Sequence, residues 1–455
     1  MQKIKLQKDI NITPAIIDYV LNKHEAERNR IARLRRYYQN NNDINKRKRH
    51  DPKKPHNLLS HGYGSYITNT AVGYFLGKSV SYKSDNNKEL LQNISNIFRY
   101  NDEPDHNTTL AKEASIYGYA IELQYTDENG DIRFKCVPGE DIAIVYDNTL
   151  EKNINFALRY FKEDEIDDKG NEEEVTYIDV YTKDKIMHFK KANDKVFPYA
   201  AEGETNEKEH MFKDVPVTVY LNNDEGMGDF ERITSLIDAY DLTQSDTAND
   251  FEYFTNCILV VSGYVLDEED ERSISDTRTL NFNDSEGKAQ YLIKNIQDTA
   301  LENYKNRLDN DIHKFTGVPN MSDESFSNNA SGVALEFKLM ALENITGVKE
   351  AKFKKGIMRR IELICNVLSF TEGSLDDYMD IVPVFTRTKP INLLEEAQRL
   401  QTLKGIYSDE TILALSSEID NPTEEMERLK REQLSLYDDN YSGNEVLNNA
   451  DTEEQ

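Results

Sequence analysis

The segment 229–369 holds the pattern that most constrains how this chain can fold. Residues 229–256 place apolar side chains at helical spacing, which predicts a rod about 40 Å long. Residues 257–297 alternate like short strands around an acidic insert, and 298–317 form a second helix that starts with a capping box and stops at Gly317. Each rod has a single apolar stripe and is too narrow to build a core alone, so we expect other copies of the chain to hold the pair.

A polar segment, residues 319–332, separates the second rod from a very long helix at about 333–369. About 14 residues without an apolar pattern are more than most helix–helix connections need, which favours a functional loop over an ordinary connector. The segment contains one Met and one Phe but no Lys or Arg, and Ser331 is a candidate N-cap for the long helix. Gly347, next to Thr346, is the expected point of a bend in that helix.

The rest of the chain predicts an α+β fold that is predominantly helical. Helical patterns cover residues 14–39, 57–77 and two stretches between 88 and 118. From about 119 to 220 the period changes to two, with a hairpin turn expected at Asn129-Gly130 and a solvated acidic loop at 163–174. A strand at 381–390, short helices from 394 onward and an acidic tail at 437–455, expected to be disordered, complete the chain.

The overall charge limits the classes of partner. The chain has 455 residues and a formal net charge of −28, so its net charge does not attract it to the phosphates of nucleic acid. Three widely spaced cysteines predict no disulfide framework and fit a reducing cytoplasm. The longest apolar run is far shorter than a membrane span, and the N-terminal residues lack the apolar core of a secretory signal.

The charge is unevenly distributed along the chain. Residues 1–60 hold 15 Lys and Arg against 6 Asp and Glu, while the remainder carries a net −37. Two basic clusters, at 28–36 and 46–54, suggest contact with a nucleic acid or an acidic partner. Few aromatic side chains accompany them, so we favour the alternative that these cations pair with acidic groups of the same assembly.

No motif predicts an enzyme. Gly77-Lys78-Ser79 imitates the end of a phosphate-binding loop, but Val72 replaces its first glycine, and the segment before it is helical rather than a strand. His56 and His61 lack a third metal ligand at suitable spacing. We therefore expect no catalytic residues, no cofactor and no metal site. A metal-dependent nuclease stays open as an alternative only because carboxylates are so abundant.

Three stretches, taken with the order of the elements, resemble a known family. They are residues 35–85, which include GYFLGKSVSY, residues 315–345, and residues 384–413 with their glycine followed by Ser-x-Glu-Thr. In this order and spacing they resemble the portal (head-to-tail connector) proteins of tailed bacteriophages, in the siphophage-type family of Gram-positive hosts. The likeness spans about 20–440.

The resemblance implies a portal fold assembled as a ring of twelve subunits. It divides the chain into a wing at 1–228 and 333–390, stem helices at 229–256 and 298–317, a small β-containing clip at 257–297, a tunnel loop at 318–332, and a crown with the acidic tail at 391–455. The ring would sit at one capsid vertex of the virion, after assembly in the host cytoplasm. Double-stranded DNA would be packaged and ejected through it non-specifically.

The resemblance also implies the partners: the terminase large subunit, the major capsid and scaffolding proteins, and head-completion (adaptor) proteins, with no membrane. The tunnel-loop residues that would line the DNA channel are Asn320, Ser322, Asp323, Ser325, Ser327, Asn328 and Asn329. Candidate channel cations of the stem are Lys305, Arg307 and Lys314, and candidate docking residues of the clip are Arg272, Arg278, Lys288 and Lys294. Candidate oligomer contacts of the stem are Phe251, Leu308 and Phe315.

One further alternative has a different function. A structural ring or scaffold protein of the capsid, without a DNA conduit role, would share the acidic composition and the helix-mediated assembly. It would not need two rods that bracket a β segment and a polar loop that follows them.

Overall fold

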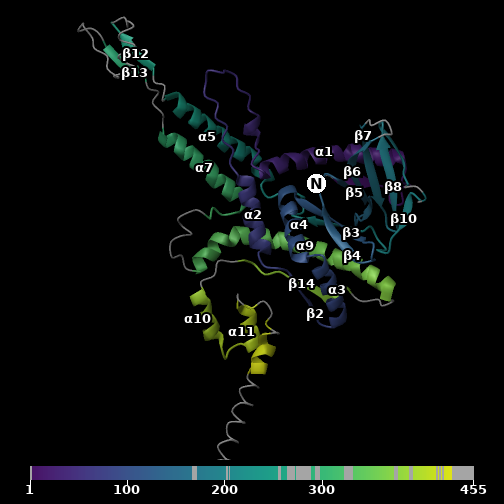
Figure 1. The fold of residues 1–455 in the computed structure, drawn as a ribbon. Helices are drawn as coiled ribbons and strands as arrows, with labels where there is room; N and C mark the ends of the chain where they lie inside the picture. Colours follow the sequence, from purple (N-terminus) through teal and green to yellow (C-terminus); the bar gives the residue numbers. More distant parts are fainter. Residues whose placement is uncertain are drawn as a thin grey trace, which may run out of the picture. The chain divides into compact units, whose positions relative to one another are not determined.

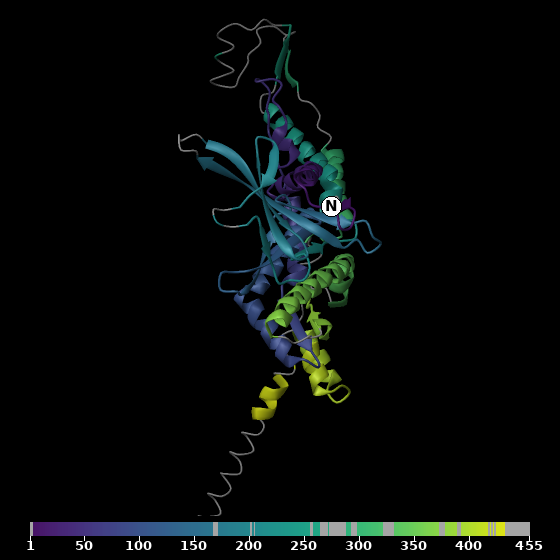
Figure 2. The ribbon, with the colours of Figure 1, turned by 90° about the vertical axis from the view of Figure 1, so that its right-hand side faces the viewer.

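The computed structural model describes residues 3–166, 172–200, 203, 205–254, 258–263, 272, 288–292, 298–321, 332–372, 378–388, 393–416, 419, 422 and 425–432. The chain divides into two compact units. The first comprises Met1–Asn320 with Leu339–Thr388, and the second Met321–Lys338 with Lys389–Gln455. Figures 1 and 2 show the ribbon from two directions.

The helices are α1 (Pro14–Tyr38), α2 (Tyr63–Leu76), α3 (Lys88–Tyr100), α4 (Glu103–Tyr117), α5 (Thr234–Phe254), α7 (Asp298–Thr316), α9 (Gly332–Glu372), α10 (Leu393–Leu403) and α11 (Asp409–Leu415), with 3-10 turns η1 (Asp43–Lys46), η2 (Glu231–Ile233) and η3 (Tyr378–Asp380). The strands are β1 (Ile4–Leu6), β2 (Ser81–Ser84), β3 (Tyr119–Thr126), β4 (Ile132–Val137), β5 (Ile142–Asp147), β6 (Ile154–Ile166), β7 (Glu172–Tyr181), β8 (Lys185–Ala192), β9 (Lys195–Pro198), β10 (Glu207–Glu209), β11 (Val217–Leu221), β12 (Ile258–Ser262), β13 (Lys288–Leu292) and β14 (Ile381–Val384).

A seven-stranded sheet with the order β1-β5-β6-β7-β8-β10 lies against helix α1, and β9 pairs with β8. Its strands alternate, so Phe156, Leu158 and Val180 point to one face and are fully buried there against Ile17 and Val20 of α1. The expected period of two is therefore confirmed. Figure 1 shows α1 running beside these strands.

The second layer is built on the sheet β11-β3-β4 and helix α9. Gly118 ends α4 with φ +88° and allows the chain to turn directly into β3. A Cβ atom there would lie 2.2 Å from the Gly226 carbonyl oxygen, so the close approach also requires glycine. Phe353, Ile357 and Ile361 of α9 fill the core on this side.

Two turn predictions had opposite outcomes. The hairpin at Asn129-Gly130 is confirmed, because β3 and β4 pair around it and Gly130 has φ +86°. The loop predicted at 163–174 was wrong at both ends, since β6 and β7 continue to Ile166 and Glu172 and pair there, and residues 167–171 lie outside the described residues. Ion pairs from Lys162 to Glu174 and from Lys190 to Glu165 offset the repulsion between the facing carboxylates.

The helix predictions were confirmed with shifted ends. Helix α2 starts at Tyr63 rather than at 57, because residues 57–62 extend along another helix, as described below. The long helix is one continuous element, Gly332–Glu372, and Gly347 lies exposed within it. Residues 273–287 of the strand-like segment 257–297, and the tail at 437–455, lie outside the described residues.

In the second unit, α10 and α11 form a short helical pair. Ser408 caps α11, since its hydroxyl accepts a hydrogen bond from the Thr411 amide. This glycine-turn-helix arrangement matches the pattern expected from the sequence around Gly405, which has φ +89°.

Candidate functional site

Helices α5 and α7 lie side by side and run in opposite directions (Figure 1). Their inner side is apolar and covered, with Ile237 and Ile312 fully buried. Their outer surface leaves large apolar side chains in solvent. Phe251 is 57% exposed, Tyr304 47% and Phe315 62%. A single chain therefore covers only one side of this pair.

The end of α7 is fixed by contacts with α2. Tyr63 donates a hydrogen bond of 2.6 Å to Asp309, and burial raises the pKa of this tyrosine above its ordinary range. His313 Nδ1 lies 2.9 Å from the Val318 carbonyl oxygen, and the Tyr66 hydroxyl donates to the Pro319 carbonyl at 3.1 Å. The first residues of the 318–332 segment are thus held in place.

Residues 42–61, here called the arm, extend along α5, a contact that the sequence did not predict. Arg47 forms an ion pair of 2.6 Å with Asp246. Further along the helix, the Leu59 amide donates to Ser245 Oγ at 2.9 Å, and the Asn57 amide donates to Asn249 Oδ1 at 2.6 Å. The polar stripe of α5, at residues 241, 245, 249 and 252, was the available signal.

Asp241 is the fully buried carboxylate at the start of this contact. Its Oδ1 accepts the His61 amide at 3.0 Å and lies 2.7 Å from His61 Nδ1, while its Oδ2 accepts the Asn42 side-chain amide at 2.6 Å. Both ends of the arm therefore meet at one carboxylate. Replacing this buried carboxylate would lower the stability of the fold, because at least one of its three hydrogen-bond donors would lose its acceptor.

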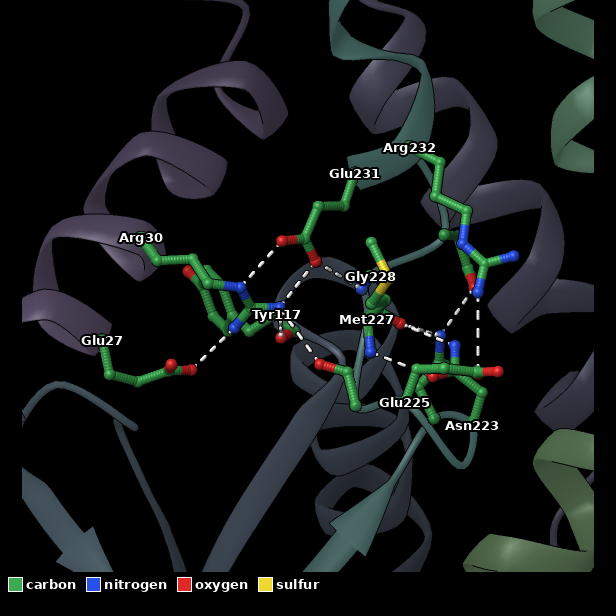
Figure 3. A network of polar contacts seen from close by, with 12 residues as sticks. Glu27, Arg30, Tyr117, Asn223, Glu225, Met227, Gly228, Glu231 and Arg232 are labelled. Atoms are coloured by element: carbon green, nitrogen blue, oxygen red, sulfur yellow. Dashed lines mark hydrogen bonds and ion pairs between the residues drawn. The ribbon is translucent and has the colours of Figure 1, made fainter. Parts of the chain in front are cut away.

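The arginines of α1 also pair within the chain. Arg30 donates to Glu27 at 2.7 Å, to both oxygens of Glu231, and to the carbonyl oxygens of Tyr117 and Gly226 (Figure 3). Arg35 and Arg36 likewise bond to carboxylates, those of Glu140 and Asp43, whereas Arg33 bonds to the Thr234 hydroxyl. Arg30, Arg35 and Arg36 thus pair with carboxylates of their own chain, as the favoured interpretation expects, whereas Arg28 lies over the Tyr160 ring.

The turn that leads into α5 is fixed from both sides. Glu231 Oε2 accepts the Gly228 amide at 3.0 Å, and the side chain of Asn223 exchanges hydrogen bonds with the backbone of Met227 (Figure 3). Lys349 of α9 forms an ion pair with Asp229, and both side chains are less than 10% exposed, at 6% and 7%. The first turn of α5 is therefore anchored to α1 and to α9.

A buried polar network, here called the Arg360 cluster, lies between α9, α4 and β3. Its members are Arg360, Glu122, His106, Asn107, Glu103 and Tyr82. Arg360 is fully buried and donates to Glu122 at 2.8 Å and to Asn107 at 2.9 Å. Its guanidinium also lies 4.6 Å from the centre of the Phe134 ring.

The two carboxyl groups of the Arg360 cluster have opposite pKa shifts. Burial raises the pKa of Glu103. Burial acts in the same direction on Glu122, but the charge of Arg360 and the hydrogen bond with His106 outweigh it, so the pKa of Glu122 is lowered. Glu122 is thus the charged partner of Arg360, and the sequence offered no signal for this pairing across 238 residues.

Several residues predicted for the stem differ in their surroundings. Lys305 is only 8% exposed and pairs with Glu302, so a channel contact is not open to it in one chain. Leu308 is 6% exposed and already covered within the chain. Arg307 and Lys314 are exposed on α7, as is Phe315.

The predicted clip and tunnel-loop residues are only partly covered by the structure. Strands β12 and β13 form an antiparallel pair in which Ser262 faces Lys288. Lys288 and Arg272 are exposed, and Asn320 is half-buried. The other predicted residues lie outside the described ones, namely Ser322, Asp323, Ser325, Ser327, Asn328, Asn329, Arg278 and Lys294.

The described residues hold no group of three or more His, Cys, Asp or Glu side chains that could bind a metal ion. His56 and His61 instead bond within the arm and to α5. The Gly-Lys-Ser segment follows the end of α2 and precedes β2, an arrangement unlike a phosphate-binding loop. None of the helices in the described ranges is long and apolar enough to cross a membrane.

Comparison with known proteins identifies the family to which this chain belongs. Residues 17–435 match the family described as "Phage portal protein, SPP1 Gp6-like". The portal protein of Bacillus phage SPP1 is 26% identical over 423 residues, which cover 87% of this chain and 82% of that protein. The portal protein of Clostridium phage phiCD119 is 28% identical over 453 residues, which cover 93% and 97%. A chain of the neck of an empty GTA particle, a solved structure computed with C6 symmetry, aligns with TM-score 0.45 and 11% identity over 78% of this chain and 90% of that one.

These matches define the class as phage portal proteins, which are structural components that connect head and tail. Within that class, the chain belongs to the SPP1 Gp6-like family. The resemblance drawn from the three sequence stretches is therefore confirmed.

Proposed function

We propose that this chain assembles into a portal ring of twelve subunits at one capsid vertex of the virion, and that double-stranded DNA is packaged and ejected through its central channel. The family supports the portal role. In this proposal α5 and α7 form the stem, the β12–β13 pair belongs to the clip, and 318–332 is the tunnel loop. The described parts of 1–228 and 333–390 form the wing, and 391–455 the crown.

The main support for a ring is that the outer surface of the α5–α7 pair is not covered in a single chain. Phe251, Tyr304 and Phe315 expose large apolar areas along two helices whose inner side is already packed. Large apolar side chains that stay in solvent on one helix pair mark a candidate interaction surface. Side-by-side copies in a ring would cover it on every subunit, because a head-to-tail contact repeats around a closed circle.

The channel contacts are proposed to be weak and independent of sequence. Arg307 and Lys314 are the described stem cations that remain exposed, while Lys305 is occupied by Glu302. The 318–332 segment contains no Lys or Arg, so it would touch DNA through short polar groups without a fixed charge. Deep phosphate-binding wells would slow a polymer that has to slide in both directions.

The proposed partners follow from the portal role. The clip, with Arg272, Arg278, Lys288 and Lys294, would dock the terminase large subunit and later the head-completion proteins. The wing would meet the major capsid and scaffolding proteins during assembly in the host cytoplasm. A capsid ring without a conduit role is the second candidate, which shares the exposed stem surface but requires no passage for DNA.

Imaging of the purified full chain by negative-stain electron microscopy tests the ring. We expect axial views with a central hole. The double variant Phe251→Asp/Phe315→Asp should give single folded chains, because both side chains are more than half exposed in one chain, at 57% and 62%. Leu150→Asp is the matched control, since Leu150 is 95% exposed on the β5–β6 connection, and rings should persist.

Two results would contradict the proposal. The unmodified protein would fail the test if it sediments and images as single chains at all concentrations. Intact rings in the double variant would show that α5 and α7 do not form the contact between subunits. Unchanged circular dichroism of the double variant is required, so that loss of rings cannot be attributed to unfolding.

A further inference from the structure

We propose that the lysine-rich turn of the arm, residues 46–54, is a binding site for the phosphate backbone of double-stranded DNA that is mounted on α5. The inference rests on the proposed function, because α5 is the helix that this function places around the DNA. It adds a site outside the 318–332 segment and the α7 cations. The main observation is that Lys48, Lys53 and Lys54 are exposed on a turn whose backbone is ordered by hydrogen bonds.

The turn is an ordered structure. Arg49 Nη2 donates to the carbonyl oxygens of Pro52 at 2.7 Å and Lys54 at 2.9 Å. Asp51 accepts the Lys53 amide at 3.0 Å. Because Arg49 and Asp51 are used within the turn, the backbone of 49–54 is closed on itself and the neighbouring lysines project from it.

Three of the four lysines of the turn have no carboxylate partner among the described residues, whereas Lys46 forms an ion pair with Asp43. Lys48, Lys53 and Lys54 are exposed, and among the described residues they form no ion pair. The carboxylates of α5 that lie beside the arm have other partners. Those partners are Arg47 for Asp246, His61 and Asn42 for Asp241, and Asn57 for Glu252. The three lysines are therefore left without a carboxylate partner among the described residues, and of the groups that hold the α5 carboxylates only Arg47 carries a fixed positive charge.

The chemistry of the turn fits phosphate better than a protein surface. Lysine is depleted in protein–protein interfaces, which favour aromatic residues and arginine, and residues 46–54 contain no aromatic residue other than His50. Lysine ammonium groups suit phosphates as point charges that carry no sequence information. The net charge of −28 does not prevent binding, because charges beyond about 10 Å are screened at 0.1 M salt.

Asp241 acts as the positioning residue of this site. It is fully buried beneath the arm and ties His61 and Asn42 to α5. Its replacement by Asn removes one negative charge from the protein. Bulk electrostatics alone then predicts tighter DNA binding, whereas a positioned turn predicts weaker binding, so the direction of the change separates the two explanations.

The test measures binding of the full chain to a labelled DNA duplex of random sequence by fluorescence anisotropy across a NaCl series. For Lys48→Gln/Lys53→Gln/Lys54→Gln we expect about tenfold weaker binding at low salt and a salt slope reduced by about 2 to 3. The matched control is Lys183→Gln/Lys195→Gln/Lys208→Gln, three exposed lysines elsewhere in the chain, which should stay within about twofold. Asp241→Asn should weaken binding, and its melting temperature is measured alongside, because the substitution also disturbs a buried carboxylate. If it lowers that temperature, Ser245→Ala, which removes only the Leu59 contact, takes its place.

Equal losses in the arm variant and its control would overturn the proposal, as would tighter binding by Asp241→Asn. A loss of rings without a change in DNA binding would assign the turn to a second copy of the chain and would also overturn it. The inference also requires that the unmodified chain binds the duplex, so a lack of binding at low salt would overturn it. Imaging of the same samples separates this outcome from failure of the ring proposal, because rings that form without binding DNA at 46–54 leave the proposed function intact.

Discussion

The Arg360 cluster and the α5–α7 pair use polar groups in opposite ways. In the cluster, a fully buried arginine meets a fully buried carboxylate between three elements of one chain. In the α5–α7 pair, the polar contacts run along one side of α5, and Phe251 and Phe315 face solvent on the other surfaces. All members of the Arg360 cluster find their partners within a single chain. The α5–α7 pair is covered only where the arm and α2 pack against it.

This difference suggests a division of labour. The Arg360 cluster fixes the register of α9 against α4 and β3, because a buried charge tolerates only one arrangement of its partners. The α5–α7 pair leaves apolar side chains exposed in one chain and is held in position by Arg30, Lys349 and Tyr63. The proposed ring therefore requires that folding and assembly are separable, and the following predictions test that separation.

The largest expected effect on the stability of the single chain comes from Arg360→Ala. Glu122 would remain buried and charged without its partner, which costs about 3 to 5 kcal/mol. Arg159→Ala is the matched control, because its ion pair with Asp179 at 3.1 Å is partly exposed and contributes at most about 1 kcal/mol. Urea unfolding of a variant that does not form rings measures both values. Equal effects of the two substitutions would mean that the buried cluster does not stabilise the chain.

A smaller, pH-dependent effect is expected at His24 of α1. Burial lowers its pKa from 6.5 to about 4, and its Nδ1 lies 2.7 Å from the Tyr160 hydroxyl. The unfolded state therefore binds a proton that the folded state refuses. Above pH 6.5 His24 is neutral in both states and does not change the free energy of unfolding. As the pH falls from 6.5 to about 4, protonation of His24 in the unfolded state lowers the free energy of unfolding by up to roughly 3 kcal/mol.

His24→Gln should remove this part of the pH dependence. The free energy of unfolding, measured by urea at a series of pH values, should fall less steeply below pH 6.5 in the variant than in the unmodified chain. His188, which is more exposed and pairs with Asp179, provides the control position. Parallel pH profiles for the unmodified chain and His24→Gln would contradict a neutral, buried His24.

The sequence predicted those features that depend on local pattern. The period of two placed β3 and β4 around Asn129-Gly130, and Gly317 placed the end of α7, whereas that helix starts at Asp298, before Thr299 of the expected capping box. The acidic segment 163–174 was misjudged because charge was taken as a loop signal, whereas Lys162 and Lys190 supply the countercharges from neighbouring positions of the sheet. Those pairs depend on strand register, which the composition of the segment does not reveal.

The parts of the site that escaped prediction are long-range contacts. Asp241 joins residues 42 and 61, and Arg360 joins Glu122, across separations for which a single sequence contains no local signal. Phe251 and Phe315 are exposed in one chain, which leaves them available for the proposed contact between subunits, whereas Leu308 is covered by its own chain. Apolar periodicity identifies the stripe of a helix but not which neighbour covers it.

Hydrogen exchange of single chains and of rings tests the central claim most directly, namely that the α5–α7 pair is completed by neighbouring copies. Single chains are obtained with the Phe251→Asp/Phe315→Asp variant and by dilution of the unmodified protein. The account predicts that amides of α5 and α7 exchange much more slowly in rings, while those of β3 and of α9 around Arg360 exchange at the same rate in both states. Equal protection of α5 and α7 in single chains and rings would contradict it.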